Sequence, residues 1–393
     1  MLSERISRIE VSSTMEVARR CTELKSKGID IIDLCVGEPD FPTPQNIIAA
    51  AKQAMEKGLT GYTINQGIPE LRQEIAKKYE SETGSNFSLQ EIIVSTGAKQ
   101  AIYNVLQSII TTGEEVLIPS PYYVSYTHMV KLAGGIPVII ETDEHNNFKI
   151  KISELEKKIT AKTKALIFCN PSNPTGTVYL KDEINKIVEF AVDRDLIIIA
   201  DEVYEKFIYD NLKFTSLANF KNKLGIKCII TNAVSKTYAM TGWRIGYAIA
   251  DANIISAANK IQSHSTSSPN SIAQYAAVEA LSGNQDSVNI MRNEFEKRRN
   301  YLYNELNSIE GISCRKSNGA FYLFPNVKKL FGKKFNGFEI NNSTDLCMYL
   351  LTESKVALVP GEGFGAPDNI RIAYTNSMEK LIEAIKRIKT GLK

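Results

Sequence analysis

The sequence predicts an α/β protein whose central sheet is mainly parallel. Short apolar runs rich in β-branched residues alternate with segments of helical period through the middle of the chain. These runs are almost continuously apolar, which is typical of strands that are covered on both faces. The chain has 393 residues, more than one hydrophobic core usually supports, so two domains are expected.

The N-terminal part is expected to form an arm and one helix, because Met15, Ala18, Cys21 and Leu24 recur at helical spacing. Residues 29–36 resemble a short strand that stops at the turn-forming residues 37–42. A helical period returns between about residues 44 and 58.

Strands and helices then alternate. We expect strands at residues 92–95, 115–119, 137–141, 165–169, 196–200 and 228–231, and helices at 71–79, 100–110, 126–132, 153–159 and 181–192. Ser153 and Glu156 have the spacing of a capping box.

The last third of the sequence turns helical at residues 272–281 and again over about 285–307, a charged helix long enough to bridge two domains. The remainder is expected to form a smaller α+β domain that packs with the N-terminal helix. The expected division is therefore an arm and helix at 1–43, a large domain at 44–284, and an interdomain helix with the small domain at 285–393.

Composition argues against several classes of protein. The net charge is only +3 and no long Lys/Arg block is present, so neither nucleic acid nor a membrane surface is an expected partner. The apolar runs are too short to span a bilayer, and the charged N-terminus does not resemble a signal peptide. Six scattered cysteines without a CxxC pair are expected to be free thiols in the cytoplasm. With three histidines, no metal centre or His-centred triad is expected.

Lys236 is the first candidate for chemistry. It follows the predicted strand at 228–231, and ligands of open α/β sheets lie at such strand ends. An unpaired buried ammonium is costly, so a lysine here must be solvated, paired or bonded to a cofactor. A loop lysine that reaches water is the alternative.

Two further loops after strands have the composition of ligand-binding turns. Residues 95–99 (Ser-Thr-Gly-Ala-Lys) can present backbone N–H groups and a helix N-terminus to a phosphate, or form an ordinary strand–helix turn. Residues 170–176 contain two prolines, in a setting where cis peptide bonds are tolerated, and would hold Asn173 rigidly. A stiff connector is the alternative for this second loop.

Asp201 ends an apolar strand, so it is expected inside the protein, where a carboxylate needs a cationic or donor partner. The alternative is a plain helix N-cap. Tyr204 lies three residues further on and can point to the same site. A lysine amine, a buried carboxylate, a phosphate cradle with Arg244, a fixed amide and a phenol together suit pyridoxal phosphate, which forms a Schiff base with lysine.

At this point the chain resembles the fold-type I, class I aminotransferases, and among them the bacterial aspartate aminotransferase-like subgroup. The resemblance covers nearly the whole chain. Its motifs here are Val36-Gly37-Glu38-Pro39-Asp40-Phe41, Gly61-Tyr62-Thr63, Gly97-Ala98-Lys99-Gln100-Ala101, Pro121-Tyr122-Tyr123-Val124-Ser125-Tyr126, residues 170–176, Asp201-Glu202-Val203-Tyr204, residues 235–246, Gly319-Ala320-Phe321-Tyr322 and Arg371-Ile372-Ala373-Tyr374. The resemblance implies a large domain with a mainly parallel seven-stranded sheet, a smaller α+β domain, and a homodimer with shared active sites.

The resemblance also implies the cofactor-binding residues. Lys236 would form the Schiff base and move protons, with its pKa held below the usual ~10.4. Asp201 would pair with the pyridinium nitrogen, and Tyr204 and Asn173 would hold the ring oxygen. Tyr123 would stack on the ring, where the family often has tryptophan. The phosphate would be bound by a set of residues that includes one from the neighbouring subunit: Ala98, Lys99, Ser235, Arg244 and the partner-reaching Tyr62.

For the substrate, the resemblance implies that Arg371 clamps the α-carboxylate as a fork, helped by Gly37 and Asn173; a surface ion pair is the alternative. The family's second arginine is missing from residues 262–269. The subgroup uses Lys99 with hydroxyls near the N-terminus, here Ser13 and Thr14. Aspartate with 2-oxoglutarate, in a ping-pong cycle, is therefore favoured. Because a lysine reads carboxylates less exclusively than arginine, aromatic or prephenate-type substrates stay open.

Two other classes of function share this fold. A pyridoxal-phosphate lyase acting on C–S bonds would release ammonia and a thiol without needing an oxo acid. The cofactor-binding half of a transcription regulator would carry an added DNA-binding module, whereas this sequence starts with the arm.

Overall fold

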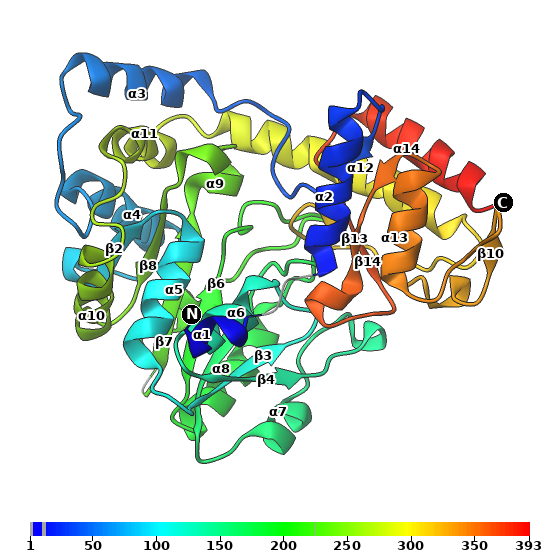
Figure 1. Cartoon of the computed structure of the whole chain (residues 1–393). Helices are drawn as coiled ribbons and strands as arrows, with labels where there is room; N and C mark the ends of the chain where they lie inside the picture. Colours follow the sequence, from blue (N-terminus) through cyan, green and yellow to red (C-terminus); the bar gives the residue numbers. More distant parts are fainter. Residues whose placement is uncertain (1–2, 10–12, 224) are drawn as a thin grey trace.

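The computed structural model describes residues 3–9, 13–223 and 225–393. It has a central sheet between two layers of helices and, beside it, a smaller packed region that contains the C-terminal helices (Figure 1). The α/β class predicted from the sequence is confirmed. In the described parts of the chain, no helix combines the length and apolarity needed to cross a bilayer.

The central sheet is mixed and mostly parallel. In spatial order its strands are β2 (Ile92–Ser95), β8 (Gly246–Ile249), β7 (Lys227–Ala233), β6 (Ile197–Asp201), β5 (Thr163–Cys169), β3 (Glu115–Pro119) and β4 (Ile136–Ile140). All neighbours run parallel except β8, which is antiparallel to both β2 and β7.

The side chains of the sheet alternate between two apolar cores, as strand geometry requires. In β6, Ile197 and Ile199 join the core on one face, whereas Ile198 and Ala200 join the core on the other. Both faces are therefore dry, which explains why the strands are apolar at nearly every position. The first face is covered by α5 (Ala98–Ile109), α6 (Ser125–Leu132) and α10 (Ala252–Ser263). The second is covered by α3 (Gln45–Glu56), α4 (Pro69–Thr83), α7 (Ile152–Lys158), α8 (Lys181–Asp193) and α11 (Ser271–Ser282).

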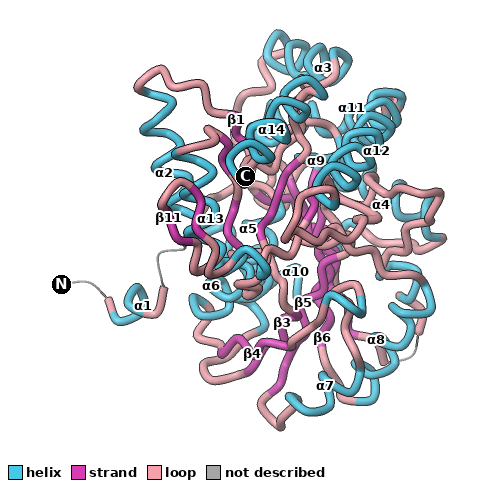
Figure 2. Tube along the Cα trace, turned by 90° about the vertical axis from the view of Figure 1, so that its right-hand side faces the viewer, coloured by secondary structure: helices cyan, strands magenta, loops and turns pink. Residues whose placement is uncertain are grey.

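The smaller region joins the two ends of the sequence. Cys21 and Leu24 of α2 (Ser13–Ser26) share one core with Leu346 and Ile385 from the C-terminal part. Figures 1 and 2 show α2 next to α13, as predicted for the N-terminal helix. The region also contains α12 (Asp286–Asn307), α13 (Ser343–Thr352), α14 (Met378–Gly391), the antiparallel set β13 (Val359–Pro360), β14 (Ile370–Ala373) and β9 (Tyr322–Leu323), the parallel pair β1 (Ile32–Asp33) and β12 (Val356–Ala357), and the hairpin β10 (Lys334–Phe335) and β11 (Phe338–Glu339).

Short helical segments complete the chain. They are α1 (Glu4–Ser7), α9 (Val234–Thr237) and the 3₁₀ turns η1 (Leu89–Glu91), η2 (Glu144–Asn146), η3 (Leu217–Phe220), η4 (Thr241–Trp243), η5 (Lys328–Leu330) and η6 (Gly361–Phe364).

Three local predictions were wrong or incomplete. The capping box is absent, because α7 starts one residue earlier, after Lys151, which places Ser153 inside the helix. The strand expected at 29–36 is reduced to Ile32–Asp33, because its partner β12 has only two residues. Strand β8 and helix α10 were not predicted at all.

Candidate active site

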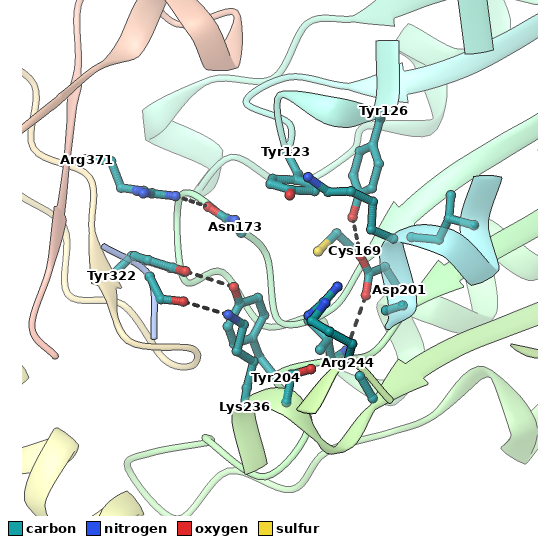
Figure 3. A pocket seen from close by; sticks show the side chains of 17 residues that line it. Tyr123, Tyr126, Cys169, Asn173, Asp201, Tyr204, Lys236, Arg244, Tyr322 and Arg371 are labelled. Atoms are coloured by element: carbon teal, nitrogen blue, oxygen red, sulfur yellow. Dashed lines mark hydrogen bonds between the residues drawn. The ribbon is translucent and has the colours of Figure 1, made fainter. Parts of the chain in front are cut away.

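The site lies where three neighbouring parallel strands end. Cys169 of β5 is in register with Asp201 of β6, and Asp201 is in register with Thr231 of β7, so the residues that follow these strands meet at one edge. A cavity of about 340 Å³ opens there, between this edge and the smaller region (Figure 3). This volume lies in the range of small-molecule sites, ~300–1,000 Å³. The cavity is lined by Gly37, Ala98, Lys99, Ile102, Tyr123, Tyr126, Cys169, Asn173, Asp201, Val203, Tyr204, Ala233, Ser235, Lys236, Arg244, Tyr322 and Arg371.

Lys236 projects into the cavity from α9, the single helical turn that follows β7. Its ammonium group donates a 2.7 Å hydrogen bond to the carbonyl oxygen of Gly37. Burial lowers the pKa of Lys236 to about 8; Glu38 opposes this shift, whereas Arg371 and Arg244 add to it. The amine can therefore lose its proton near neutral pH, which a nucleophile or a general base requires.

Asp201 lies on the other side of the cavity and is 6% exposed. Burial raises the pKa of this carboxyl group, and two hydrogen bonds oppose the rise. The hydroxyl of Tyr126 donates to Oδ2 at 2.6 Å, and the backbone N–H of Val203 donates to Oδ1 at 3.3 Å. Both donors are neutral, so a cation that entered the cavity would find a buried carboxylate ready to pair with it.

Arg371 reaches the cavity from β14 and is 9% exposed. Its Nη1 donates to Asn173 Oδ1 at 3.0 Å, and its Nη2 donates to the carbonyl oxygen of Cys35 at 2.7 Å. The buried Nε–H finds no acceptor among the described residues. Both acceptors are neutral, so the surface ion pair considered as an alternative is not formed. A buried guanidinium with an orphaned donor is suited to bind a carboxylate ligand.

The N-terminus of α5 lies at the cavity, through Ala98 and Lys99. Gly97 caps the helix at φ +82°, and the first N–H groups of a helix, here those of Ala98 and Lys99, have no acceptor within it. The guanidinium of Arg244 lies against Gly97, since a Cβ on this glycine would come within 2.3 Å of Nη2. Gly246 is equally constrained, with its Cβ position 2.2 Å from the nitrogen of Ala98. The glycines thus allow cationic and N–H groups to converge on one point.

The phenol groups of Tyr204 and Tyr322 are 2.8 Å apart and share a hydrogen bond. Tyr204 follows β6, whereas Tyr322 belongs to β9 of the smaller region, so the bond links the two parts of the protein (Figure 3). The ring of Tyr123 stands edge-on to that of Tyr126, with centroids 5.5 Å apart. The amino group of Lys99 lies 5.5 Å from the centroid of the Tyr123 ring.

The structure therefore brings together in one cavity every site residue predicted from the sequence except Tyr62, Ser13 and Thr14. Tyr62 is 99% exposed and lies outside this cavity. The side chains of Ser13 and Thr14 fall outside what the structure describes.

Among the lining residues to which sequence reasoning gave no role, three carry a hydroxyl or thiol group: Tyr126, Tyr322 and Cys169. Tyr126 lies three residues after Tyr123, in the first turn of α6, so its position close to Tyr123 in the sequence could have pointed to the same cavity. Cys169 is the last residue of β5, just as Asp201 is the last residue of β6. The end of a buried strand was the signal that identified Asp201, and it applies equally to Cys169. Tyr322 gave no such signal, because its place depends on strand pairing across distant segments.

Comparison with known proteins agrees with this geometry. The family described as aminotransferase class I and II matches residues 29–388. An aspartate aminotransferase of Geobacillus stearothermophilus is 45% identical over 387 residues, covering 98% of each chain. A probable aspartate/prephenate aminotransferase of Rickettsia bellii is 45% identical over 390 residues, covering 99% of this chain and 98% of that protein. The crystal structure of the aspartate aminotransferase from Rhizobium meliloti superposes with a TM-score of 0.96 at 38% identity, covering 100% of this chain and 98% of that one.

Proposed function

The chain belongs to the class I and II aminotransferases, and we propose that it moves the amino group of aspartate to 2-oxoglutarate in a ping-pong cycle with pyridoxal phosphate. One observation carries the proposal. A buried lysine whose pKa is lowered to about 8 lies in the same cavity as the buried carboxyl group of Asp201 and the guanidinium of Arg371, which has an orphaned donor.

The cavity suits this cofactor on its own chemistry. The N–H groups at the start of α5, Ser235 and Arg244 would bind the phosphate, and Asp201 would pair with the ring nitrogen. Tyr123 would stack on the ring. Asn173 Oδ1 accepts from Arg371, so the amide N–H groups of Asn173 would be free to join Tyr204 at the ring oxygen. When bound, pyridoxal phosphate supplies an electron sink for the bonds at the amino acid's Cα.

Other residues of the cavity would bind the substrate and transfer the proton. Arg371 would bind the α-carboxylate as a fork, and its contacts with Asn173 and Cys35 would fix the fork's direction. Gly37, whose carbonyl oxygen holds Lys236, would complete this end of the site. Lys236 would carry a proton between the substrate's Cα and the cofactor, and its low pKa supports this use.

The identity of the substrate's side chain is inferred from the position of Lys99. Its amino group lines the cavity and would meet the second carboxylate of aspartate or glutamate, with Ser13 and Thr14 as the expected hydroxyl partners. The relative from Geobacillus stearothermophilus, named an aspartate aminotransferase, supports this choice. The name of the Rickettsia bellii protein supports prephenate or a broader set of substrates as a second candidate. A C–S lyase has no comparable support.

We also propose a homodimer in which Tyr62 reaches the phosphate in the partner's cavity. The residues next to Tyr62 are anchored through their side chains, because Gln274 Nε2 donates to Thr63 Oγ1 at 3.0 Å and Asn65 Nδ2 donates to Asn259 Oδ1 at 2.5 Å. The ring of Tyr62 nevertheless projects with 99% exposure, next to the 56%-exposed Ile64. Exposed aromatic and apolar side chains that lie next to each other are typical of an interface.

Two organisational proposals accompany this function. The chain would divide into a large cofactor-binding domain at 44–284 and a small domain formed by 1–43 and 285–393, in keeping with the core that α2 shares with the C-terminal part. The free cysteines of the described chain, three of them buried, suit a reducing compartment such as the cytoplasm.

A half-reaction panel tests the function. Protein loaded with pyridoxal phosphate is mixed in turn with aspartate, glutamate, phenylalanine and alanine, and the loss of visible absorption is followed. The converted enzyme is then offered 2-oxoglutarate or prephenate. We expect aspartate and glutamate to react fastest and 2-oxoglutarate to restore the absorption, with Lys236→Ala inert. No reaction with any amino acid, or release of ammonia without an oxo acid, would exclude the proposal.

A further inference from the structure

We propose that Tyr322 is a positioning residue that holds the phenol of Tyr204 and the guanidinium of Arg371 in a fixed relation, so that one side chain sets both the cofactor end and the substrate end of the cavity. The inference rests on the proposed function, because it assumes that pyridoxal phosphate and an amino acid occupy these two ends. Tyr322 is 1% exposed, and both of its partners line the same cavity.

The strand register explains how Tyr322 meets Arg371. Tyr322 of β9 is paired with Ala373 of β14, and Arg371 lies two residues before Ala373 on the same strand. Side chains two residues apart share a face of a sheet, so Tyr322 and Arg371 are diagonal neighbours on one face. The guanidinium accordingly lies over the Tyr322 ring, 4.6 Å from its centroid. Such stacking restrains the plane of the guanidinium, on which a two-pronged carboxylate contact depends.

The hydroxyl group of Tyr322 is held as firmly as its ring. It is 2.8 Å from the hydroxyl of Tyr204. It also lies against the backbone of Gly37, since a Cβ there would come within 2.1 Å of the phenol oxygen. The carbonyl oxygen of this same glycine accepts the hydrogen bond from Lys236. Only a residue without a side chain fits at position 37, so the phenol pair and the lysine share one close-packed corner.

The direction of the phenol pair follows from what Tyr204 must do. If the O–H group of Tyr204 donates its hydrogen bond to the ring oxygen of the cofactor, the Tyr204 oxygen can only accept from its neighbour, and Tyr322 is then the donor. A hydrogen bond received by Tyr204 polarises its O–H group and makes it a stronger donor. Such a donor would withdraw negative charge from the ring oxygen of bound pyridoxal phosphate. Lys236, when bonded to the cofactor, would then hold its proton less tightly.

Two substitutions separate the contributions of the hydroxyl and the ring. Tyr322→Phe removes the hydroxyl and keeps the ring under Arg371, whereas Tyr322→Leu removes both. Tyr374→Phe is the matched control, because this tyrosine follows β14 and its buried hydroxyl contacts Ser317 and the carbonyl oxygen of Ala320 instead. Each variant is loaded with pyridoxal phosphate. The pKa at which the visible absorption of the bound cofactor changes is measured, and so is the Kd of maleate, a non-reacting dicarboxylate. Thermal unfolding of each variant confirms that it is folded.

We expect Tyr322→Phe to raise the spectroscopic pKa by about 0.3–1 pH unit, the size of a lost cooperative hydrogen bond, and to leave the maleate Kd within about twofold. Tyr322→Leu should show the same pKa rise and bind maleate at least about fivefold more weakly. Tyr374→Phe should change neither quantity. An unchanged spectroscopic pKa in Tyr322→Phe, or unchanged maleate binding in Tyr322→Leu, would overturn the inference. These results leave the proposed function standing, whereas wild-type protein that takes up no pyridoxal phosphate would overturn the proposed function itself.

Discussion

The hydroxyl of Tyr126 donates a 2.6 Å hydrogen bond to Oδ2 of Asp201. The two residues come from different elements, helix α6 and the end of strand β6, and both are buried. Burial raises the pKa of Asp201, and the bond from Tyr126 is the strongest influence that opposes the rise. The tyrosine therefore favours the ionised form of a carboxyl group whose pKa burial raises.

Tyr126→Phe tests this relationship. Without the bond, the pKa of Asp201 should rise further, and the carboxylate should hold a protonated ring nitrogen less well. We expect kcat to fall about tenfold, equivalent to ~1.4 kcal/mol, and the acid limb of its pH profile to move to higher pH. Tyr179→Phe is the control, because it removes a buried hydroxyl that accepts from the backbone of Ile150. An acid limb at the wild-type position would argue against this role for Tyr126.

The pKa of Lys236, lowered from 10.5 to about 8, predicts how the cofactor-free protein captures pyridoxal phosphate. Only the neutral amine attacks an aldehyde, so the rate of colour formation should rise with pH and level off above a midpoint near 8. Lys236→Ala should show no such phase. A midpoint close to the ordinary lysine value of ~10.4 would contradict the predicted shift.

The same pKa shift has a consequence for stability. Between pH 8 and 10.5 the folded protein has released the proton of Lys236, whereas the unfolded chain still binds it. The unfolded state then binds more protons, so this residue makes the free energy of unfolding increase with pH across that window. The difference in free energy of unfolding between the cofactor-free wild type and Lys236→Met should vary with pH only there. A difference that is constant from about pH 7 to 11 would count against the shift.

Arg371→Ala should lower kcat/KM for every amino acid by an amount equivalent to about 2–5 kcal/mol, the range for removing one partner of a buried charge pair. Arg371→Lys keeps the charge and loses the fork, so it should recover only part of the loss. Steady-state kinetics with aspartate and phenylalanine give kcat/KM of the wild type and of both variants. A loss below about fivefold for both substrates would remove Arg371 from the α-carboxylate site.

Lys99→Met keeps the length of the side chain and removes its charge, while the backbone N–H at the start of α5 stays in place. If Lys99 binds the second carboxylate, kcat/KM for aspartate should fall about tenfold, whereas the value for phenylalanine should change less than about threefold. Equal losses for the two substrates would instead indicate damage to the phosphate cradle.

In the proposed homodimer, the hydroxyl of Tyr62 would reach the phosphate in the partner's cavity. Because its ring is 99% exposed in the single chain, Tyr62→Phe should leave the fold unchanged and remove only a hydroxyl. We expect the Kd of pyridoxal phosphate to rise about tenfold, as for one lost hydrogen bond to a charged group, while analytical ultracentrifugation still shows a dimer. A monomeric wild-type protein that is fully active would reject the shared site.

Residues close in sequence were the predictable part of this protein. The apolar strands β2, β3, β5 and β6 stood out because both of their faces are buried, and the polar residues after them marked the cavity. Strand β8 was missed because Gly246 and Tyr247 weaken its apolar pattern, although Gly246 is needed there for close contact with Ala98. The capping box at Ser153 failed because spacing alone does not fix where a helix begins.

Long-range pairing was not predictable in the same way. Tyr322 meets Tyr204 and Arg371 only after β9 pairs with β14 and the smaller region closes on the sheet. Tyr126 is the last residue of the motif at 121–126, but its hydrogen bond to Asp201 depends on how α6 packs on the sheet. Both tyrosines form a hydrogen bond through the hydroxyl group to another side chain of the cavity. The pattern of residues in a single sequence does not predict such contacts.

The bond between pyridoxal phosphate and Lys236, on which the proposed function depends, can be tested directly. Purified protein is mixed with the cofactor, reduced with borohydride, digested and analysed by mass spectrometry. The account predicts one reduced pyridoxyl adduct, on Lys236, and full protection of this lysine from other amine reagents. An adduct confined to other lysines, or aminotransferase activity that survives in Lys236→Ala, would contradict it.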